Sequence, residues 1–269
     1  MAYKTILFEK QDTIGMLTLN RPEMLNAASV ELIEELRDCF AKLYNDFQTR
    51  VVIIRGAGRA FCSGLDLKEG FKAPSKSEFG EIQYRYHKVQ QAFADVIVRM
   101  RRVPQPIIGA IRGPAVGGGF SLALACDLRI AGKSARFNAG YILIGLSGTD
   151  LGSSYFLPRI IGFSQAAEYL LTGRFLDAAT AERFGLVSRV VADDQVDAAA
   201  LELANEMLQN SPLGLRMTKE VMNFNIDAPS LESALHLENR TQLMLSLTED
   251  GEEGAQAFLE KRTPLYRDR

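Results

Sequence analysis

The sequence predicts an α/β fold with an α-helical C-terminal part. Short apolar runs typical of strands alternate with amphipathic helical segments over residues 1–196, whereas the pattern over residues 197–269 is almost wholly helical. The chain has 269 residues, a length that suits one large domain, or one domain with an appendage. We therefore expect an α/β core at 1–196 and a helical region at 197–269.

The first elements follow from local patterns. Apolar runs at residues 5–8 and 14–19 predict two strands that are joined by a turn at Gln11 and Asp12. Ser29 has the short polar side chain that caps helix N-termini, so a helix is expected to begin after it. One face of this helix is apolar and is formed by Leu32, Ile33, Leu36, Phe40 and Leu43.

Strand and helix patterns then alternate along the chain. Residues 51–54 predict a buried strand that ends in a glycine turn at residues 56–58. Pro104 and Pro106 are expected to end a long helical segment, because proline cannot continue a helix. The predicted order is a helix at 76–101, a strand at 107–111, a glycine turn at 113–119, a helix at 120–125 and a strand at 127–131.

Composition and charge argue against several classes of function. The net charge is −2 without a basic stretch, which argues against a nucleic-acid partner. Cys39, Cys62 and Cys126 form no C-x-x-C pair and are expected to be structural thiols in a reducing compartment. Two histidines argue against a histidine-based metal site. With a charged N-terminus and no apolar run of membrane-spanning length, we expect a soluble, cytoplasmic protein without a membrane partner.

Residues 113–121, Gly-Pro-Ala-Val-Gly-Gly-Gly-Phe-Ser, carry the strongest chemical signal. Three glycines between a strand and a helix let a ligand approach the backbone closely. Free N–H groups at the start of the helix stabilise negative charge, such as that of a thioester oxyanion. The alternative is a tight turn that only packs the helix on the strand.

Residues 60–68, Ala-Phe-Cys-Ser-Gly-Leu-Asp-Leu-Lys, form a second segment of this kind after the strand at 51–54. Such a turn presents another backbone N–H. An oxyanion hole needs two converging donors, each worth about 100- to 1,000-fold in rate. The two segments together therefore supply the required kind of donor, while their convergence depends on the fold.

Five stretches, in this order, resemble the signature segments of the enoyl-CoA hydratase/isomerase (crotonase) superfamily: 19–27, 60–68, 113–127, 171–187 and 258–262. The resemblance implies a ClpP/crotonase-like spiral of ββα units in the core and an α-helical C-terminal trimerisation region. It further implies a homotrimer or a dimer of trimers, and an acyl-CoA substrate. No permanently bound cofactor is implied, because coenzyme A is part of the substrate. One fold hosts many reactions, so the reaction itself is left open.

The same resemblance assigns residues to the binding of the thioester. The N–H groups of Leu65 and Gly118 are expected to hold the thioester oxygen as an oxyanion hole. Lys68 would lie near the coenzyme A phosphates. Phe258 and Lys261, near the C-terminus, would reach the nucleotide from a neighbouring subunit. For both lysines the alternative is a solvated surface position. The implied coenzyme A-binding residues are Leu25, Ala60, Asp66, Lys68, Phe258 and Lys261.

The chain departs from the hydratase pattern at two positions. Ser121 and Tyr141 stand where the resembling hydratases have glutamates. Hydration needs a base that activates water and an acid that delivers a proton, and neither side chain replaces a carboxylate well. Two-glutamate hydration is therefore disfavoured. Ser121 is expected to form a small part of the substrate pocket wall, and Tyr141 is expected either to pack or to act on the substrate.

Asp150 is the carboxylate that remains in this region. Its surroundings resemble dienoyl-CoA isomerase and chlorobenzoyl-CoA dehalogenase, which have an aspartate at the matching place when the alignment runs backward from Pro158. In the dehalogenase a helical histidine is the base, but His87 lies about two helical turns too early for that role. The alternative for Asp150 is a solvated loop or a helix cap.

Three functions stay open at this point. The first is an acyl-CoA isomerase or lyase that stabilises an enolate, with Asp150 and Tyr141 as catalytic candidates. The second is a thioester hydrolase or a dehalogenase-like enzyme in which Asp150 reacts directly. The third is a non-catalytic acyl-CoA-binding protein that has kept the pocket and lost the chemistry.

Overall fold

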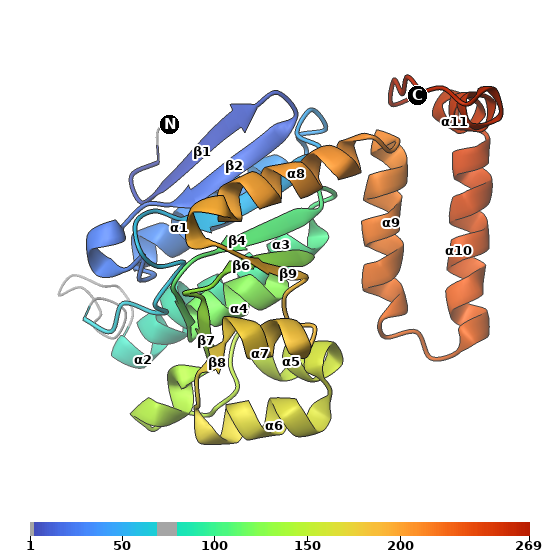
Figure 1. Cartoon of the computed structure of the whole chain (residues 1–269). Coiled ribbons are helices and arrows are strands. Elements are labelled where there is room, and N and C mark those ends of the chain that lie inside the picture. The colour runs from blue at the N-terminus through green and yellow to red at the C-terminus, as the bar shows by residue number, and fades with distance from the viewer. Residues whose placement is uncertain (1–2, 69–79) are drawn as a thin grey trace.

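The computed structural model describes residues 3–68 and 80–269, which form an α/β core with a helical extension (Figure 1). A six-stranded sheet has the order β1-β2-β3-β4-β6-β9. The pair β1–β2 is antiparallel, and each further neighbouring pair is parallel. The strands are β1 (Ile6–Gln11), β2 (Ile14–Leu19), β3 (Val51–Gly56), β4 (Ile107–Ile111), β6 (Leu128–Gly132) and β9 (Arg189–Val191).

Helices surround this sheet and continue beyond it toward the C-terminus. Those from the first half of the chain are α1 (Val30–Leu43), α2 (Glu81–Tyr84), α3 (Gln91–Arg102) and α4 (Gly118–Ala125). Those from the second half are α5 (Ser153–Ile161), α6 (Phe163–Thr172), α7 (Ala178–Arg183), α8 (Val196–Leu208), α9 (Pro212–Asn225), α10 (Leu231–Ser246) and α11 (Glu249–Glu260).

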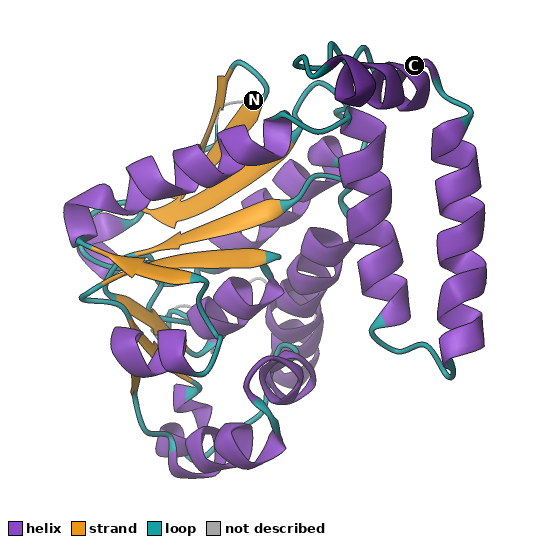
Figure 2. Ribbon diagram, turned by 45° about the vertical axis from the view of Figure 1, so that its right-hand side comes forward, coloured by secondary structure: helices purple, strands orange, loops and turns teal. Residues whose placement is uncertain are grey.

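The two faces of the sheet are covered by different helices, because successive strand residues point to opposite sides. Val52 and Ile54 of β3 belong to the large core cluster, together with side chains of α1, α3 and α4. Val51 and Ile53 belong to a second cluster, together with side chains of α8. Figure 2 shows α8 lying along one face of the sheet. The alternating side chains of β3 thus pack against helices on both faces of the sheet.

The two predicted N-terminal strands and the helix after Ser29 are confirmed, but β1 extends to Gln11, so the turn lies at Asp12 and Thr13 instead of Gln11 and Asp12. The Oγ atom of Ser29 accepts the Leu32 N–H at 3.2 Å and caps α1, whose predicted apolar stripe is buried. The long helix expected at 76–101 is interrupted in its described part. There α2 is followed by a π-helical segment, Arg85–Gln90, before α3 begins. Residues 76–79 lie outside the described residues.

A second, three-stranded sheet is made of β5 (Pro114–Val116), β7 (Arg136–Asn138) and β8 (Leu176–Asp177) in that order. The segment 113–119, expected to be only a turn, therefore contains a strand. β5 is short and has no alternating pattern of its own. It is extended because its backbone pairs in register with β7, with Ala115 opposite Phe137.

The region expected to be helical, residues 197–269, contains a helix that packs on the sheet and an arm that extends from the core. α8 starts at the expected boundary but packs on β3, β4 and β6, so it belongs to the core. The helices α9, α10 and α11 form an arm that extends from the core in Figures 1 and 2. Lys219 ties the arm to the core, because its Nζ donates to the carbonyl oxygens of Met100 at 3.1 Å and Gln105 at 2.8 Å and lies 2.9 Å from an Asp127 carboxylate oxygen.

Candidate active site

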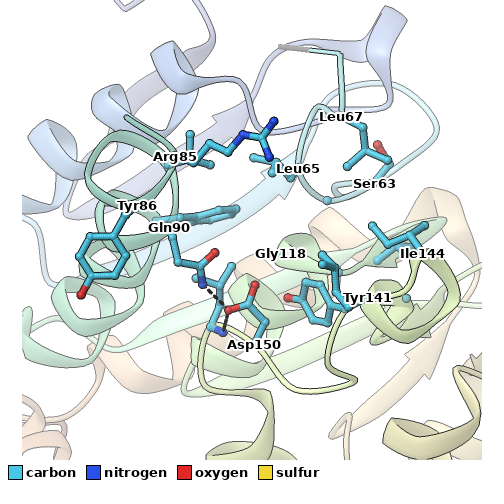
Figure 3. A pocket seen from close by; sticks show the side chains of 18 of the residues that line it. Ser63, Leu65, Leu67, Arg85, Tyr86, Gln90, Gly118, Tyr141, Ile144 and Asp150 are labelled. Carbon is cyan, nitrogen blue, oxygen red and sulfur yellow. Dashed lines mark hydrogen bonds between the residues drawn. The ribbon is translucent and has the colours of Figure 1, made fainter. Parts of the chain in front are cut away.

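A cavity of about 420 Å³ lies between two walls that differ in kind. We call residues 63–67 and 116–118 the backbone wall, because two glycine-containing turns supply it. Residues 82–93 and 140–151 supply the opposite face, which we call the side-chain wall. Figure 3 shows Gln90, Asp150 and Tyr141 of the side-chain wall near Gly118 of the backbone wall.

The backbone wall is held together by hydrogen bonds between segments far apart in the sequence. The N–H groups of Phe61 and Cys62 both donate to the Pro114 carbonyl at 3.1 Å, and the Val116 N–H donates to the Cys62 carbonyl at 2.9 Å. A Cβ atom on Gly119 would lie 2.1 Å from the Cys62 carbonyl oxygen. Only glycine fits at that position, so the close approach explains one glycine of the triplet.

The pairing brings two backbone N–H groups to the cavity. Gly118 is the first residue of α4, so its N–H has no acceptor within the helix. The residues on either side of Leu65 pair with Ala28, whereas the Leu65 N–H does not. A Cβ on Gly64 would lie 3.6 Å from the Gly118 nitrogen, so the two turns are in contact. Among the described residues, neither the Leu65 nor the Gly118 N–H donates to a protein acceptor, and both residues line the cavity.

Asp150 lies in the side-chain wall and is held by one of its two carboxylate oxygens. Oδ1 accepts hydrogen bonds from the Gln90 side chain and from the Leu151 N–H, the latter at 2.8 Å. Leu151 has φ 46°, a left-handed conformation that is uncommon outside glycine and concentrates at functional sites. Burial raises the pKa of the Asp150 carboxyl above its ordinary value, and the two hydrogen bonds partly offset this rise.

Tyr141 is buried with its hydroxyl 3.0 Å from the Ser121 Oγ. Ser121 also donates to the Asp150 carbonyl at 3.2 Å, so its single proton is used there and the tyrosine proton is left to bond the serine. Burial raises the pKa of the Tyr141 hydroxyl, which therefore stays neutral. A Cβ on Gly117 would lie 3.4 Å from the tyrosine ring, so the ring packs against the backbone wall.

Ser121 does not line the cavity as expected. Its side chain is fully buried behind Tyr141, because the larger ring occupies the space in front of it. The serine instead connects Tyr141 with the Asp150 backbone. Ser121 thus supports the two cavity residues Tyr141 and Asp150.

The other chemically active side chains of this region are few. Arg85 and Asp150 are the charged side chains among the described cavity residues, and Arg85 forms an ion pair with Glu81. His87 is exposed on the same π-helical segment, bonds Gln91 at 3.0 Å and does not line the cavity. Within 3–68 and 80–269, no cluster of three or more histidine, cysteine, aspartate or glutamate residues could hold a metal ion. Burial raises the pKa of the Cys62 thiol to about 12, so it is not a ready nucleophile.

Comparison with known protein families shows to which family the chain belongs. Residues 9–269 match the family model of enoyl-CoA hydratase/isomerase. The chain belongs to the enoyl-CoA hydratase/isomerase family. A probable enoyl-CoA hydratase echA12 of Mycobacterium tuberculosis is 41% identical over 256 residues, which cover 95% of this chain and 90% of that protein. The crotonase fold expected from the sequence is thereby confirmed, together with the superfamily.

Solved structures of the enoyl-CoA hydratase/isomerase family share the whole architecture. A probable enoyl-CoA hydratase/isomerase from Mycobacterium abscessus superposes with a TM-score of 0.91 at 38% identity, covering 99% of this chain and 100% of that chain. A monofunctional enoyl-CoA isomerase from M. smegmatis superposes with a TM-score of 0.72 at 39% identity, covering 86% of this chain and 98% of that chain. Within the described residues, no helix is long and apolar enough to cross a membrane.

The residues of this chain that were expected to bind coenzyme A differ in how exposed they are and in the hydrogen bonds they form. Asp66 is buried, with an ion pair to Arg21 at 3.2 Å and a hydrogen bond from the Lys68 N–H at 3.1 Å. Its carboxylate is thus used inside the protein. Lys68 is exposed beside it. The carbonyl oxygens of Leu25 and Ala60 accept hydrogen bonds from other loop residues, at 3.0 Å from the Ser63 N–H and 2.8 Å from the Asn26 side chain.

Phe258 and Lys261 lie on the arm rather than beside the cavity. Phe258 is 83% exposed on α11, and Lys261 ends this helix in a left-handed conformation with φ 56°. Figure 1 shows α11 at the far end of the arm, whereas α2 lies on the opposite side of the core.

Sequence reasoning missed Gln90. It is the cavity residue whose side chain contacts Asp150, although 60 positions separate the two. A glutamine in a polar helical segment belongs to no motif. Whether its side chain contacts the Asp150 carboxylate depends on how the segment folds.

Proposed function

We propose that this enoyl-CoA hydratase/isomerase-family enzyme moves a double bond within an acyl-CoA thioester, with Asp150 as the proton carrier. The observation that supports this proposal most directly is that Asp150, the one carboxylate among the described cavity residues, shares the cavity with two backbone N–H groups that have no acceptor in the described part of the chain. One carboxylate suffices to take a proton from one carbon and return it to another. Hydration instead needs an acid and a base that act on water together.

Leu65 and Gly118 supply the electrostatic part of this proposal as an oxyanion hole. Their N–H groups would donate hydrogen bonds to the thioester oxygen, and the dipole at the start of α4 would favour the negative charge of the enolate. Asp150 removes a proton from the α-carbon of a β,γ-unsaturated thioester, which gives a dienolate, and returns the proton to the γ-carbon at the other end of the allylic system. The double bond moves along the acyl chain of the substrate, and no atom is gained or lost.

Tyr141 orients the substrate in this mechanism instead of transferring a proton. Its hydroxyl proton is engaged by Ser121, and its raised pKa disfavours ionisation. Most other side chains of the cavity are apolar, including Leu67, Val89 and Phe93. These surroundings support an apolar acyl group close to the reacting carbons.

Coenzyme A would lie along the outer edge of the backbone wall, with Lys68 near its phosphates and with Leu25 and Ala60 shaping the loop. Phe258 and Lys261 would come from a neighbouring subunit of a homotrimer or a dimer of trimers. The arm supports this assembly, because it exposes large apolar side chains that a single chain leaves in water. They include Met222, Phe224, Leu243, Met244, Leu247 and Leu259.

The test is turnover of a β,γ-unsaturated probe, β,γ-hexenoyl-CoA, followed by the rise in absorbance of the conjugated enoyl thioester. We expect turnover without metal or nicotinamide, and slow hydration of crotonyl-CoA in a parallel assay. Efficient hydration of crotonyl-CoA with no isomerisation would contradict the proposal. The dehalogenase-like alternative is less well supported, because no histidine lies among the described cavity residues to act as its base.

A further inference from the structure

The two oxygens of Asp150 have different surroundings. Oδ1 accepts both the Gln90 amide and the Leu151 N–H. Among the described residues, Oδ2 accepts no hydrogen bond from the protein. Figure 3 shows it turned toward the space bounded by Gln90, Tyr141 and Gly118. A carboxylate held by one oxygen presents the lone pairs of the other to a ligand in a defined direction.

The π-helical segment brings Gln90 to this position. The Gln91 N–H donates to the Tyr86 carbonyl five residues earlier, which is the π-helical pattern. Arg85, Tyr86 and Val89 of the same segment also line the cavity. Gln90 itself is exposed and has no place in the apolar core, so its contact with Asp150 is not a by-product of core packing.

We propose that Gln90 is a positioning residue that, together with the Leu151 N–H, holds Asp150 Oδ1 and so makes Oδ2 the oxygen that exchanges the proton with the substrate. The inference rests on the proposed function of Asp150 as proton carrier. A glutamine suits this role because its amide donates at every pH and has no acidic proton to exchange with the substrate. It thus fixes the base without competing with it.

Gln90 also acts on the charge of Asp150. Burial favours the protonated acid, while a hydrogen bond donated to the carboxylate favours the ionised base. The other charged or titratable side chains that line the cavity are Arg85, Tyr86 and Tyr141. Loss of the Gln90 donor therefore raises the pKa of Asp150, and a carboxylate at position 90 raises it further by repulsion.

The experiment compares Gln90→Ala and Gln90→Glu with wild type and with the matched control Gln91→Ala. Gln91 is an exposed glutamine beside Gln90 that bonds His87 and does not line the cavity. With β,γ-hexenoyl-CoA as probe, we expect Gln90→Ala to lower kcat about tenfold, the effect of one hydrogen bond to a charged group, with KM within about twofold. The acid limb of the pH profile should move to higher pH in Gln90→Ala and further in Gln90→Glu. Gln91→Ala should match wild type.

Carbon NMR titration of the Asp150 carboxyl gives a readout that needs no substrate, with Asp150→Asn used to assign the signal. The pKa of Asp150 should rise from wild type to Gln90→Ala and again to Gln90→Glu. An unchanged kcat and an unchanged Asp150 pKa in Gln90→Ala, with Asp150→Asn inactive, would overturn the role of Gln90 alone. Near-normal turnover of Asp150→Asn would instead overturn the proposed function, and the reactive role of Oδ2 with it.

Discussion

The backbone wall of the cavity is built from buried glycine turns that hydrogen bonds hold side by side, whereas the side-chain wall comes largely from short irregular elements and carries several exposed side chains. In the first wall, Gly117 and Gly118 are buried, as is the adjoining Gly119, and the spacing is set by main-chain contacts. In the second wall, Tyr86, Gln90 and Ile144 are exposed. The comparison teaches that the proposed donors for the thioester depend on backbone geometry, while the proposed reaction depends on replaceable side chains.

The largest effect is expected from breaking the backbone wall. Gly119→Ala would place a Cβ atom 2.1 Å from the Cys62 carbonyl oxygen, a backbone atom that cannot rotate away. We expect a loss of about 3 kcal/mol or more in the free energy of unfolding, measured by denaturant titration. Gly80→Ala is the control, because a Cβ there meets nothing within 4 Å. Equal stability of the two variants would contradict the rigid backbone wall.

The next effect is expected from the chemistry of the side-chain wall. Asp150→Asn is nearly isosteric and removes the charge, so the fold and the affinity for coenzyme A should survive. We expect kcat on β,γ-hexenoyl-CoA to fall at least about 100-fold with little change in KM. Steady-state kinetics and calorimetry with coenzyme A separate the two effects. A loss of coenzyme A affinity that accounts for the lost activity would assign Asp150 to binding.

A smaller effect is expected from Tyr141→Phe. The ring that packs on Gly117 remains, while the hydroxyl that bonds Ser121 is lost. We expect kcat to fall by less than about tenfold and stability by about 1 kcal/mol, the ordinary contribution of one hydrogen bond. A fall as large as that of Asp150→Asn in the same assay would move the proton transfer to the tyrosine.

The smallest effect is expected in the pH dependence of stability. The folded protein raises the pKa of Asp150, so the ionised carboxylate disfavours folding above that pKa and the protonated form does not. Asp150→Asn should therefore equal or slightly exceed wild type in thermal stability at neutral pH. The difference should shrink as the pH falls below the pKa of the folded state and should vanish below the pKa of the unfolded state. Thermal unfolding between neutral and acidic pH measures it. A variant that is less stable at neutral pH would indicate that the carboxylate stabilises the fold.

Asp66 and Asp150 show where reasoning from sequence and the structure differ. Both aspartates lie in segments that resemble family signatures, and both were expected near the substrate. Asp66 is instead turned inward to Arg21, whereas Asp150 faces the cavity. A motif places a backbone segment, but the direction of its side chains depends on which partners the neighbouring segments offer.

The sequence by itself determined the features that depend on local chain properties. The Ser29 cap, the strands at β3 and β4 and the buried stripe of α1 follow from short-range patterns, and the superfamily follows from ordered motifs. The glycine turn at 117–119 was recognisable because close backbone approach demands glycine. Such constraints act over a few residues and leave a visible pattern.

Only the tertiary structure decided which distant side chains meet. The contact of Gln90 with Asp150, the burial of Ser121 behind Tyr141 and the packing of α8 on the sheet each join segments from different parts of the chain. None of these contacts has a sequence signal, because a contact between distant segments places no requirement on the residues next to it in the sequence. Which oxygen of Asp150 the protein leaves without a hydrogen bond, among the described residues, is therefore set by the packing of the π-helical segment against the loop that carries Asp150.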